Sequence, residues 1–150
     1  MELSYGFLYK QEVKSALEKL DSASFDGRTA YNIRRIIYEC ERNFKILQAE
    51  FRDLIKKYAV LNEKGEPVEP DERGNFKLRD GVMMDYQKEM IALMNKKFTL
   101  ERCEQIAIDT IMDSKDLKLS SFDIGVLEPV ISGLDLSQPQ ASDPAPLHSV

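Results

Sequence analysis

The longest regular pattern in the chain is a ladder of apolar residues between positions 30 and 58. Its spacings alternate between three and four residues, so the ladder follows one face of a helix. At about 1.5 Å per residue, this pattern predicts a single helix of about 45 Å. The members of the ladder are Ala30, Ile33, Ile37, Cys40, Phe44, Leu47, Phe51, Leu54 and Tyr58.

Two packing arrangements would bury this ladder. A parallel two-stranded coiled coil would place aromatic residues at positions where β-branched residues fit best, so the pattern disfavours a zipper. Ile36, Ile46 and Ile55 widen the apolar surface beyond a narrow seam, which favours a helix packed on several neighbours within one domain. The alternative is that these extra apolar residues remain exposed and bind a partner or a second copy. We therefore take Ile36, Ile46 and Ile55 as candidate interaction residues.

Weaker helical patterns flank the ladder. Apolar residues at helical spacing predict an amphipathic helix over residues 4–20 and a third helix over residues 81–97, with methionines on its buried side. Asp26, Gly27 and Thr29 mark the start of the long helix. Ser120 and Asp123 match a capping box, which predicts a short last helix that Pro129 limits.

The segments between these helices carry turn and strand signals. Glycines and prolines over residues 60–78 predict an excursion that turns back at Gly65 in a short hairpin. Alternation of apolar and polar residues predicts two or three short strands near residues 98–100, 106–108 and 117–119.

Together these elements predict a mainly helical α+β fold. A single domain over residues 1–133 has the first and third helices packed along the long one and a small sheet closing one end. Residues 134–150 are polar and proline-rich, and such a segment cannot bury enough apolar surface to offset its ordering entropy. This tail supplies three further candidate interaction residues, Pro139, Pro144 and Pro146.

Composition and charge narrow the classes of partner. The chain has 150 residues, of which 43% are hydrophobic and 31% are charged, as expected for one compact domain. Its net charge of -5 disfavours nucleic acid, because phosphate backbones attract clustered Lys and Arg. Basic residues do occur along the long helix, but interleaved acids such as Glu39, Glu41 and Asp53 dilute their field. The beginning of the chain lacks signal-peptide order and no apolar run is long enough for a bilayer, so we expect a protein that is neither secreted nor in a membrane.

The titratable residues do not form a catalytic pattern. His148, the one histidine, is the third residue from the end of the sequence and is poorly placed for a general base. Cys40 lies on the ladder, so we expect a reduced packing residue, and we expect the same of Cys103. Asp85 and Glu89 share a helix face, where a solvent-facing stripe explains them better than paired catalytic carboxylates.

The acidic segment Asp109, Asp113 and Asp116 has no glycine-bearing calcium loop around it. No phosphate-binding glycine loop, serine elbow or zinc-spaced cluster is present in the sequence. We therefore expect no catalytic, cofactor or metal site and no enzymatic activity.

Two motifs carry a resemblance to a known family. The long helix begins with Ala30 and Tyr31 and ends in the run 54–58, LIKKY, before a glycine turn; near the C-terminus a serine-led helix ends in the run 127–131, LEPVI. This arrangement resembles a family of small uncharacterised phage and prophage proteins over residues 5–132. The insertion at residues 69–81 and the proline-rich tail depart from the family pattern. The resemblance implies a phage origin and brings no activity or catalytic residues.

From these observations we expect a non-enzymatic protein-interaction module of phage origin. In the first version it is a virion structural or assembly component that docks on other subunits. In the alternative it is an early accessory protein that binds and modulates a host factor. Either version predicts a protein partner, allows a homo-oligomer, involves no nucleic acid or membrane, and places the protein in the host cytoplasm or the virion.

Overall fold

The computed structural model describes residues 1–134 of the chain. The fold is mainly helical with a minor β component, which confirms the predicted α+β class. In chain order the elements are β1 (Glu2–Ser4), α1 (Tyr5–Tyr9), α2 (Gln11–Ser22), α3 (Gly27–Tyr58), α4 (Met83–Asn95), β2 (Lys97–Thr99), β3 (Ile106–Ala107), α5 (Ile108–Met112), α6 (Ser121–Val126), the 3-10 helix η1 (Glu128–Val130) and β4 (Ile131–Ser132).

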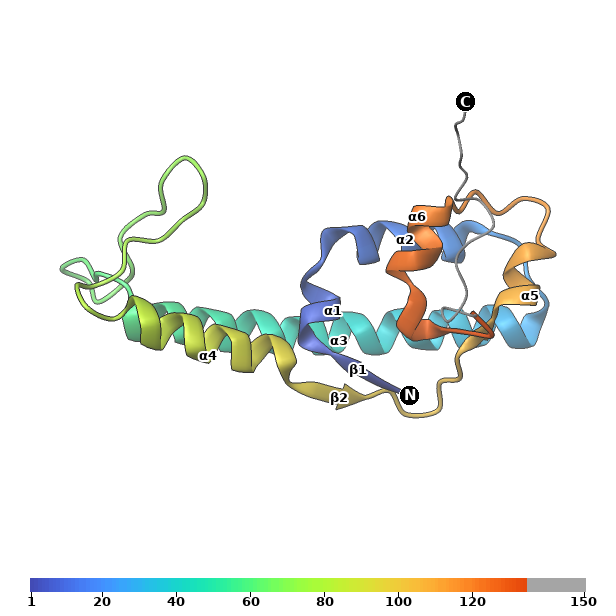
Figure 1. Cartoon of the computed structure of the whole chain (residues 1–150), viewed down its shortest axis with the longest axis horizontal. Helices are drawn as coiled ribbons and strands as arrows, with labels where there is room; N and C mark the ends of the chain where they lie inside the picture. The colour runs from blue at the N-terminus through green and yellow to red at the C-terminus, as the bar shows by residue number, and fades with distance from the viewer. Residues whose placement is uncertain (135–150) are drawn as a thin grey trace, which may run out of the picture.

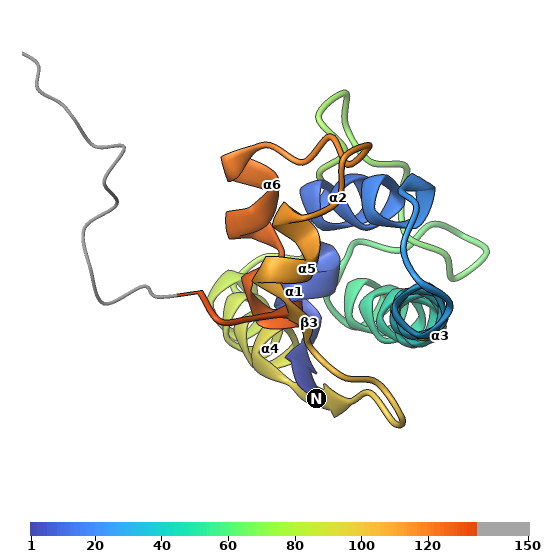
Figure 2. The same ribbon diagram turned by 90° about the vertical axis from the view of Figure 1, so that its right-hand side faces the viewer.

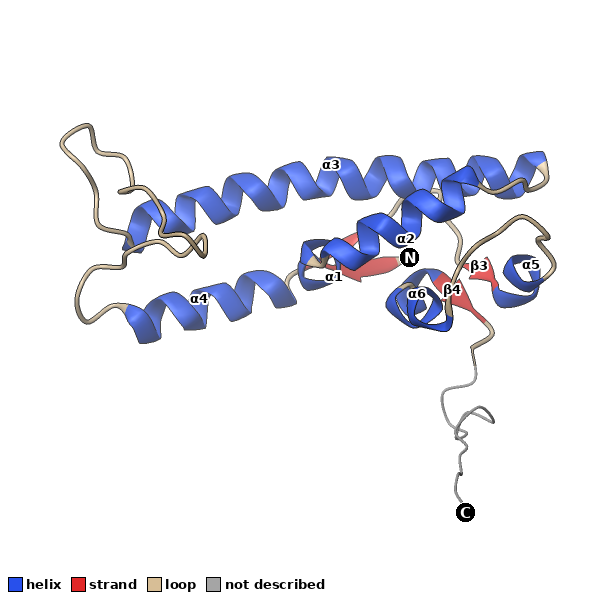
Figure 3. Ribbon diagram, turned by 90° about the horizontal axis from the view of Figure 1, so that it is seen from above, coloured by secondary structure: helices blue, strands red, loops and turns tan. Residues whose placement is uncertain are grey.

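Helix α3 forms the long axis of the molecule (Figure 1). Around its first half lie α1, α2, α5, α6 and the short strands, which we call the body (residues 1–47 and 93–134). Along its second half only α4 runs antiparallel to it, and a long loop joins the two at their common end (Figure 3). We call this helical hairpin, residues 48–92, the arm.

Local sequence signals set the helix boundaries. The Asp26 carboxylate accepts a hydrogen bond from the Thr29 amide at 2.9 Å and caps α3, within the segment 26–29 that was predicted to hold the cap. The predicted capping box is also confirmed, because the Asp123 amide donates to Ser120 Oγ at 3.1 Å and the Ser120 amide donates to Asp123 Oδ2 at 3.0 Å.

The predicted helix over residues 4–20 is interrupted. Its first residue, Ser4, ends β1 and caps α1, and an extended Lys10, with φ of -74° and ψ of 122°, separates α1 from α2. The break lets α1 pack against α3 and α4 while α2 turns to pack against α3 and α6. Gly6 lies where α1 meets α4, since a Cβ at this position would approach the Met94 carbonyl oxygen to 3.0 Å. Helical periodicity alone did not reveal this change of direction.

The predicted single sheet is replaced by two separate two-stranded sheets. β1 pairs antiparallel with β2, with Leu3 opposite Phe98, and β3 pairs parallel with β4, with Ile106 opposite Ile131. Residues 117–119 do not form the third predicted strand. In the arm, Gly65 has a φ of 76° and the chain turns back there, with a bridge between Leu61 and Pro67.

The connected hydrophobic core lies in the body. It includes Leu20, Ile33, Leu47 and Leu127, and no residue between Leu47 and Leu100 belongs to it. Helix α4 has no fully buried side chain. On its predicted methionine-rich inner face, Met90 and Met94 are only partly buried, and Met83 is 52% exposed. One neighbouring helix covers too little of the arm to bury this face.

Candidate functional site

The predicted interaction residues differ in how far the structure exposes them. Ile36 and Ile55 are buried, with 0% and 4% exposure, so their proposed role as surface contacts is wrong. They are buried because α3 packs on neighbours over a wider face than the ladder alone defines. Ile46 is exposed at 42%. Pro139, Pro144 and Pro146 lie outside the described residues.

The ladder itself is buried unevenly. The buried members in the body are Ile33, Cys40 and Leu47, and Tyr58 is buried at the end of the arm. The other members are only partly buried or exposed, namely Ala30, Ile37, Phe44, Phe51 and Leu54. The uncovered members therefore leave apolar surface along α3.

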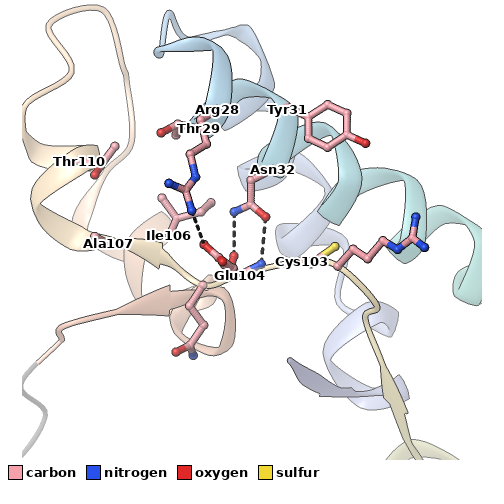
Figure 4. Close-up of a pocket in the computed structure, with 11 residues that line it drawn as sticks. Arg28, Thr29, Tyr31, Asn32, Cys103, Glu104, Ile106, Ala107 and Thr110 are labelled. Atoms are coloured by element: carbon pink, nitrogen blue, oxygen red, sulfur yellow. Dashed lines mark hydrogen bonds and ion pairs between the residues drawn. The ribbon is translucent and has the colours of Figure 1, made fainter.

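A polar pocket lies at the beginning of α3 (Figure 4). Its volume is about 330 Å³, and its central feature is a reciprocal pair of hydrogen bonds. Asn32 Nδ2 donates to the Glu104 carbonyl oxygen at 2.8 Å, and the Glu104 amide donates to Asn32 Oδ1 at 2.9 Å. The Arg28 guanidinium lies 4.0 Å from the Glu104 carboxylate. These groups satisfy one another's hydrogen-bonding and charge requirements. We therefore interpret their contacts as a structural link between residues 100–105 and α3, and not as a ligand site.

A larger groove of about 730 Å³ lies between α2 and α3. Figure 2 looks nearly along α3 and shows α2 as a separate rod above it. Val13 and Leu17 of α2 and Ile37 of α3 contribute apolar side chains to its lining. At one end the Asp21 carboxylate pairs with the Arg34 guanidinium at 2.8 Å, which joins the two helices across the groove. This groove is the candidate functional site.

Exposed aromatic residues gather at the groove. Tyr9, Tyr31, Tyr38 and Phe44 line it and are exposed at 57%, 68%, 57% and 37%. Among the large hydrophobic residues exposed in the described part of the chain there are five aromatic side chains, and only Phe122 lies elsewhere. Tyrosine combines apolar area with a hydroxyl that can hydrogen-bond, which makes it effective in protein-binding surfaces. The gathering is therefore suited to contact with another polypeptide.

The charge around the groove is opposite to that of the whole protein. Five basic and three acidic residues line it, although the chain carries a net charge of -5. Arg35 faces the buried Glu39 carboxylate at 3.6 Å, so Glu39 is not the solvent-facing acid that the sequence suggested. The lysines of the rim, Lys10, Lys14 and Lys45, form no ion pair within residues 1–134. The rim thus favours an acidic ligand.

Cys40 also contributes to the groove lining, but its chemistry is that of a packing residue. It is 5% exposed, as its ladder position predicts, and burial raises the pKa of its thiol to about 12. A thiol with this pKa is protonated near neutral pH and is a poor nucleophile. Cys103 is also buried, and burial raises its thiol pKa as well.

Two of the acidic residues considered as catalytic or metal-binding candidates, Glu89 and Asp116, make structural contacts instead. Glu89 pairs with the Lys57 ammonium at 2.7 Å, and that hydrogen bond lowers the pKa of its carboxyl group. Asp116 accepts hydrogen bonds from the Ser24 amide and the Ser114 hydroxyl, which lower its pKa. In the stretch from residue 1 to residue 134, no group of three His, Cys, Asp or Glu side chains could hold a metal ion.

The sequence did not identify Tyr9, Tyr31 or Tyr38 as site residues. Tyr31 and Tyr38 are seven positions apart and share a face of α3, which is a detectable signal. Its meaning depends on α2 and Tyr9 lying opposite that face, and this arrangement follows from the break at Lys10.

Within the described part of the chain, we found no helix with the length and apolar character needed to cross a bilayer. Comparison with protein-family models, curated proteins and solved structures gave no match for this chain.

Proposed function

We propose that this protein is a non-enzymatic interaction module and that the groove between α2 and α3 binds a short apolar segment flanked by acidic residues. The observation that carries the proposal is the concentration of exposed aromatic side chains along one groove, which holds four of the five found among residues 1–134. Desolvation of such side chains contributes strongly to protein association.

The rim supports the choice of an acidic ligand. Lys10 and Lys14 come from the α2 side and Lys45 from α3, so positive charge borders the apolar floor on both sides. Exposed charges of this kind contribute more to the rate and specificity of association than to affinity. We therefore expect association that weakens as the salt concentration rises.

The sequence suggested two roles, which predict different partners: another virion subunit or a host factor. If the protein is a virion or assembly component, mass spectrometry of purified particles should detect it at stoichiometric amounts. If it modulates a host factor, a tagged copy expressed in host cells should recover one dominant host protein. These versions rest on the resemblance to phage and prophage proteins and remain proposals.

A photoreactive phenylalanine analogue at position 38 tests the groove directly. Irradiation of cells that express this full-length protein should produce a defined cross-linked species, because Tyr38 lines the groove and is 57% exposed. The matched control carries the same analogue at position 122, since Phe122 is 65% exposed and lies outside the groove. Equal cross-linking at both positions, or none at position 38, would contradict the proposal.

A further inference from the structure

The arm carries an acidic, proline-containing segment that matches the chemistry of the groove. Residues 62–72, NEKGEPVEPDE, contain five acidic residues and one lysine. Within them Pro67, Val68, Glu69 and Pro70 form a P-x-x-P sequence. Val68 is 38% exposed, and Glu69 and Pro70 are also exposed. The segment therefore presents an apolar side chain between prolines and carboxylates.

Proline-containing segments of this type suit grooves lined by aromatic side chains. Proline fixes its own φ and restricts the preceding residue to extended conformations, so little entropy is lost when such a segment binds. Aromatic side chains supply flat surfaces on which proline rings pack. The groove provides Tyr9, Tyr38 and Phe44 for this purpose, with lysines at its rim for the carboxylates.

The segment is held too far away to enter the groove of its own chain. The Val68 amide donates to the Val60 carbonyl oxygen at 2.9 Å, and the Arg79 amide donates to the Tyr58 carbonyl oxygen at 2.9 Å. These bonds attach the loop to the far end of α3, at the opposite end of the molecule from most of α2 (Figure 1). Along α3, Tyr58 is about 30 Å from Tyr38, at about 1.5 Å per residue. An intramolecular contact would require the loop to detach from the arm.

We propose that the groove between α2 and α3 binds the segment 62–72 of a second copy of this chain. This inference rests on the proposed function and names the partner of the same groove. Each copy offers one groove and one acidic segment at opposite ends, so the contact joins different surfaces of the two copies. Such heterologous contacts build rings or open chains when they repeat.

Sedimentation velocity on the full-length protein tests this association. At low salt, the mean mass should rise with loading concentration between about 1 µM and about 1 mM, the range of weak contacts. Two variants should remain monomeric: Tyr38→Ala in the groove, and Val68→Ser with Pro70→Ala in the segment. Phe122→Ala, which removes an exposed aromatic side chain outside the groove, should associate as the unmodified chain does. Circular dichroism establishes that each variant is folded.

Mixing the two defective variants gives the most specific result. The Tyr38→Ala chain retains an intact acidic segment and the other variant retains an intact groove, so together they should form pairs limited to one copy of each. Absence of pairs would overturn the inference, as would a monomeric unmodified protein or a segment variant that still associates.

A charge exchange tests the electrostatic part of the contact. Lys14→Glu and Glu69→Lys should each weaken association, and the chain carrying both substitutions should recover part of it. Failure of the double variant to associate more strongly than either single variant would contradict the pairing of these surfaces.

The cross-linking experiment at position 38 separates this inference from the proposed function. A cross-linked product of twice the chain mass supports the second copy as the occupant. A product with a different protein, combined with a monomeric purified chain, overturns the second-copy inference and retains the interaction module. No product and no association would overturn both.

Discussion

The body and the arm share α3 and differ in how the apolar residues of that helix are covered. In the body, Ile36 and Leu47 are 0% and 2% exposed, because several elements surround this part of the helix. In the arm, Ile55 and Tyr58 of α3 are buried, but Phe51 and Leu54 are only partly buried and α4 has no buried side chain. The same periodicity therefore forms a well-packed core in one region and a thin two-helix contact in the other.

The arm is held by a small number of contacts. The rings of Tyr58 and Tyr86 meet edge to face with centroids 6.0 Å apart, and the Lys57 ammonium lies 2.7 Å from the Glu89 carboxylate. Regions with few buried apolar contacts open locally at lower free energy than the core. We therefore expect the arm to open more readily than the body.

The largest effect is expected when leucine is replaced by alanine in the body and, for comparison, in the arm. Leu47→Ala should lower the free energy of unfolding by about 2–4 kcal/mol, because it leaves a cavity in the body. Leu54→Ala should cost about 1 kcal/mol, because its side chain is only partly buried in the arm. Urea denaturation measures both. Equal losses would show that the arm is packed as well as the body.

The buried thiol of Cys40 tests how well the body is packed at one position. Cys40→Ser should lower the free energy of unfolding by about 1–3 kcal/mol, because it places a hydroxyl in apolar surroundings. Ala49→Ser, on the exposed part of α3, is the matched control and should cost about 0.5 kcal/mol through helix propensity. An unchanged denaturation midpoint for Cys40→Ser would mean that this position is accessible to water.

Asp123 should make the stability of the body depend on pH. This buried carboxylate pairs with the Lys19 ammonium at 2.8 Å and completes the α6 capping box, and the hydrogen bond from Lys19 lowers its pKa. Because the pKa of Asp123 is lower in the folded state, its ionised carboxylate stabilises the fold at pH values above the pKa of the unfolded state. This stabilisation is lost as the pH falls through the pKa of the folded state. Asp123→Asn should therefore cost about 1–2 kcal/mol at pH 7.

The difference between Asp123→Asn and the unmodified chain should shrink once the pH falls below about 4, near the usual pKa of aspartate. Urea denaturation at neutral and acidic pH measures it. A difference that stays constant with pH would assign the effect to packing and not to the charge of Asp123.

The smallest effect is expected at the surface of the arm. Glu89→Gln removes a pair whose side chains are 41% and 58% exposed, and exposed pairs contribute little to global stability. The unfolding midpoint should not change measurably, whereas amide hydrogen exchange in α4 should become faster. Slower or unchanged exchange in α4 would show that this pair does not hold the arm closed.

Local sequence signals predicted much of the fold. The ladder gave the extent of α3 to within a few residues, and Asp26 and Ser120 mark two helix starts as expected. These signals succeed because helix formation and capping depend on residues three or four positions apart. The burial of Cys40 and Leu47 followed from the same spacing.

The sequence predicted the candidate site less well than it predicted the helices. Ile36 and Ile55, two of the candidate interaction residues, are buried, as a helix packed on several neighbours requires, whereas Tyr31 and Tyr38 were not singled out and line the groove. Spacing along one helix defines a face but not which neighbour covers it. The covering depends on contacts between distant parts of the chain.

The sequence by itself therefore determined the long helix, its caps and the acidic character of residues 62–72. Tertiary structure decided the bend at Lys10, the pairing of β1 with β2 and the groove between α2 and α3. The physical reason is the range of the interactions: hydrogen bonds within a helix are local, whereas strand pairing and helix packing join residues far apart in the chain.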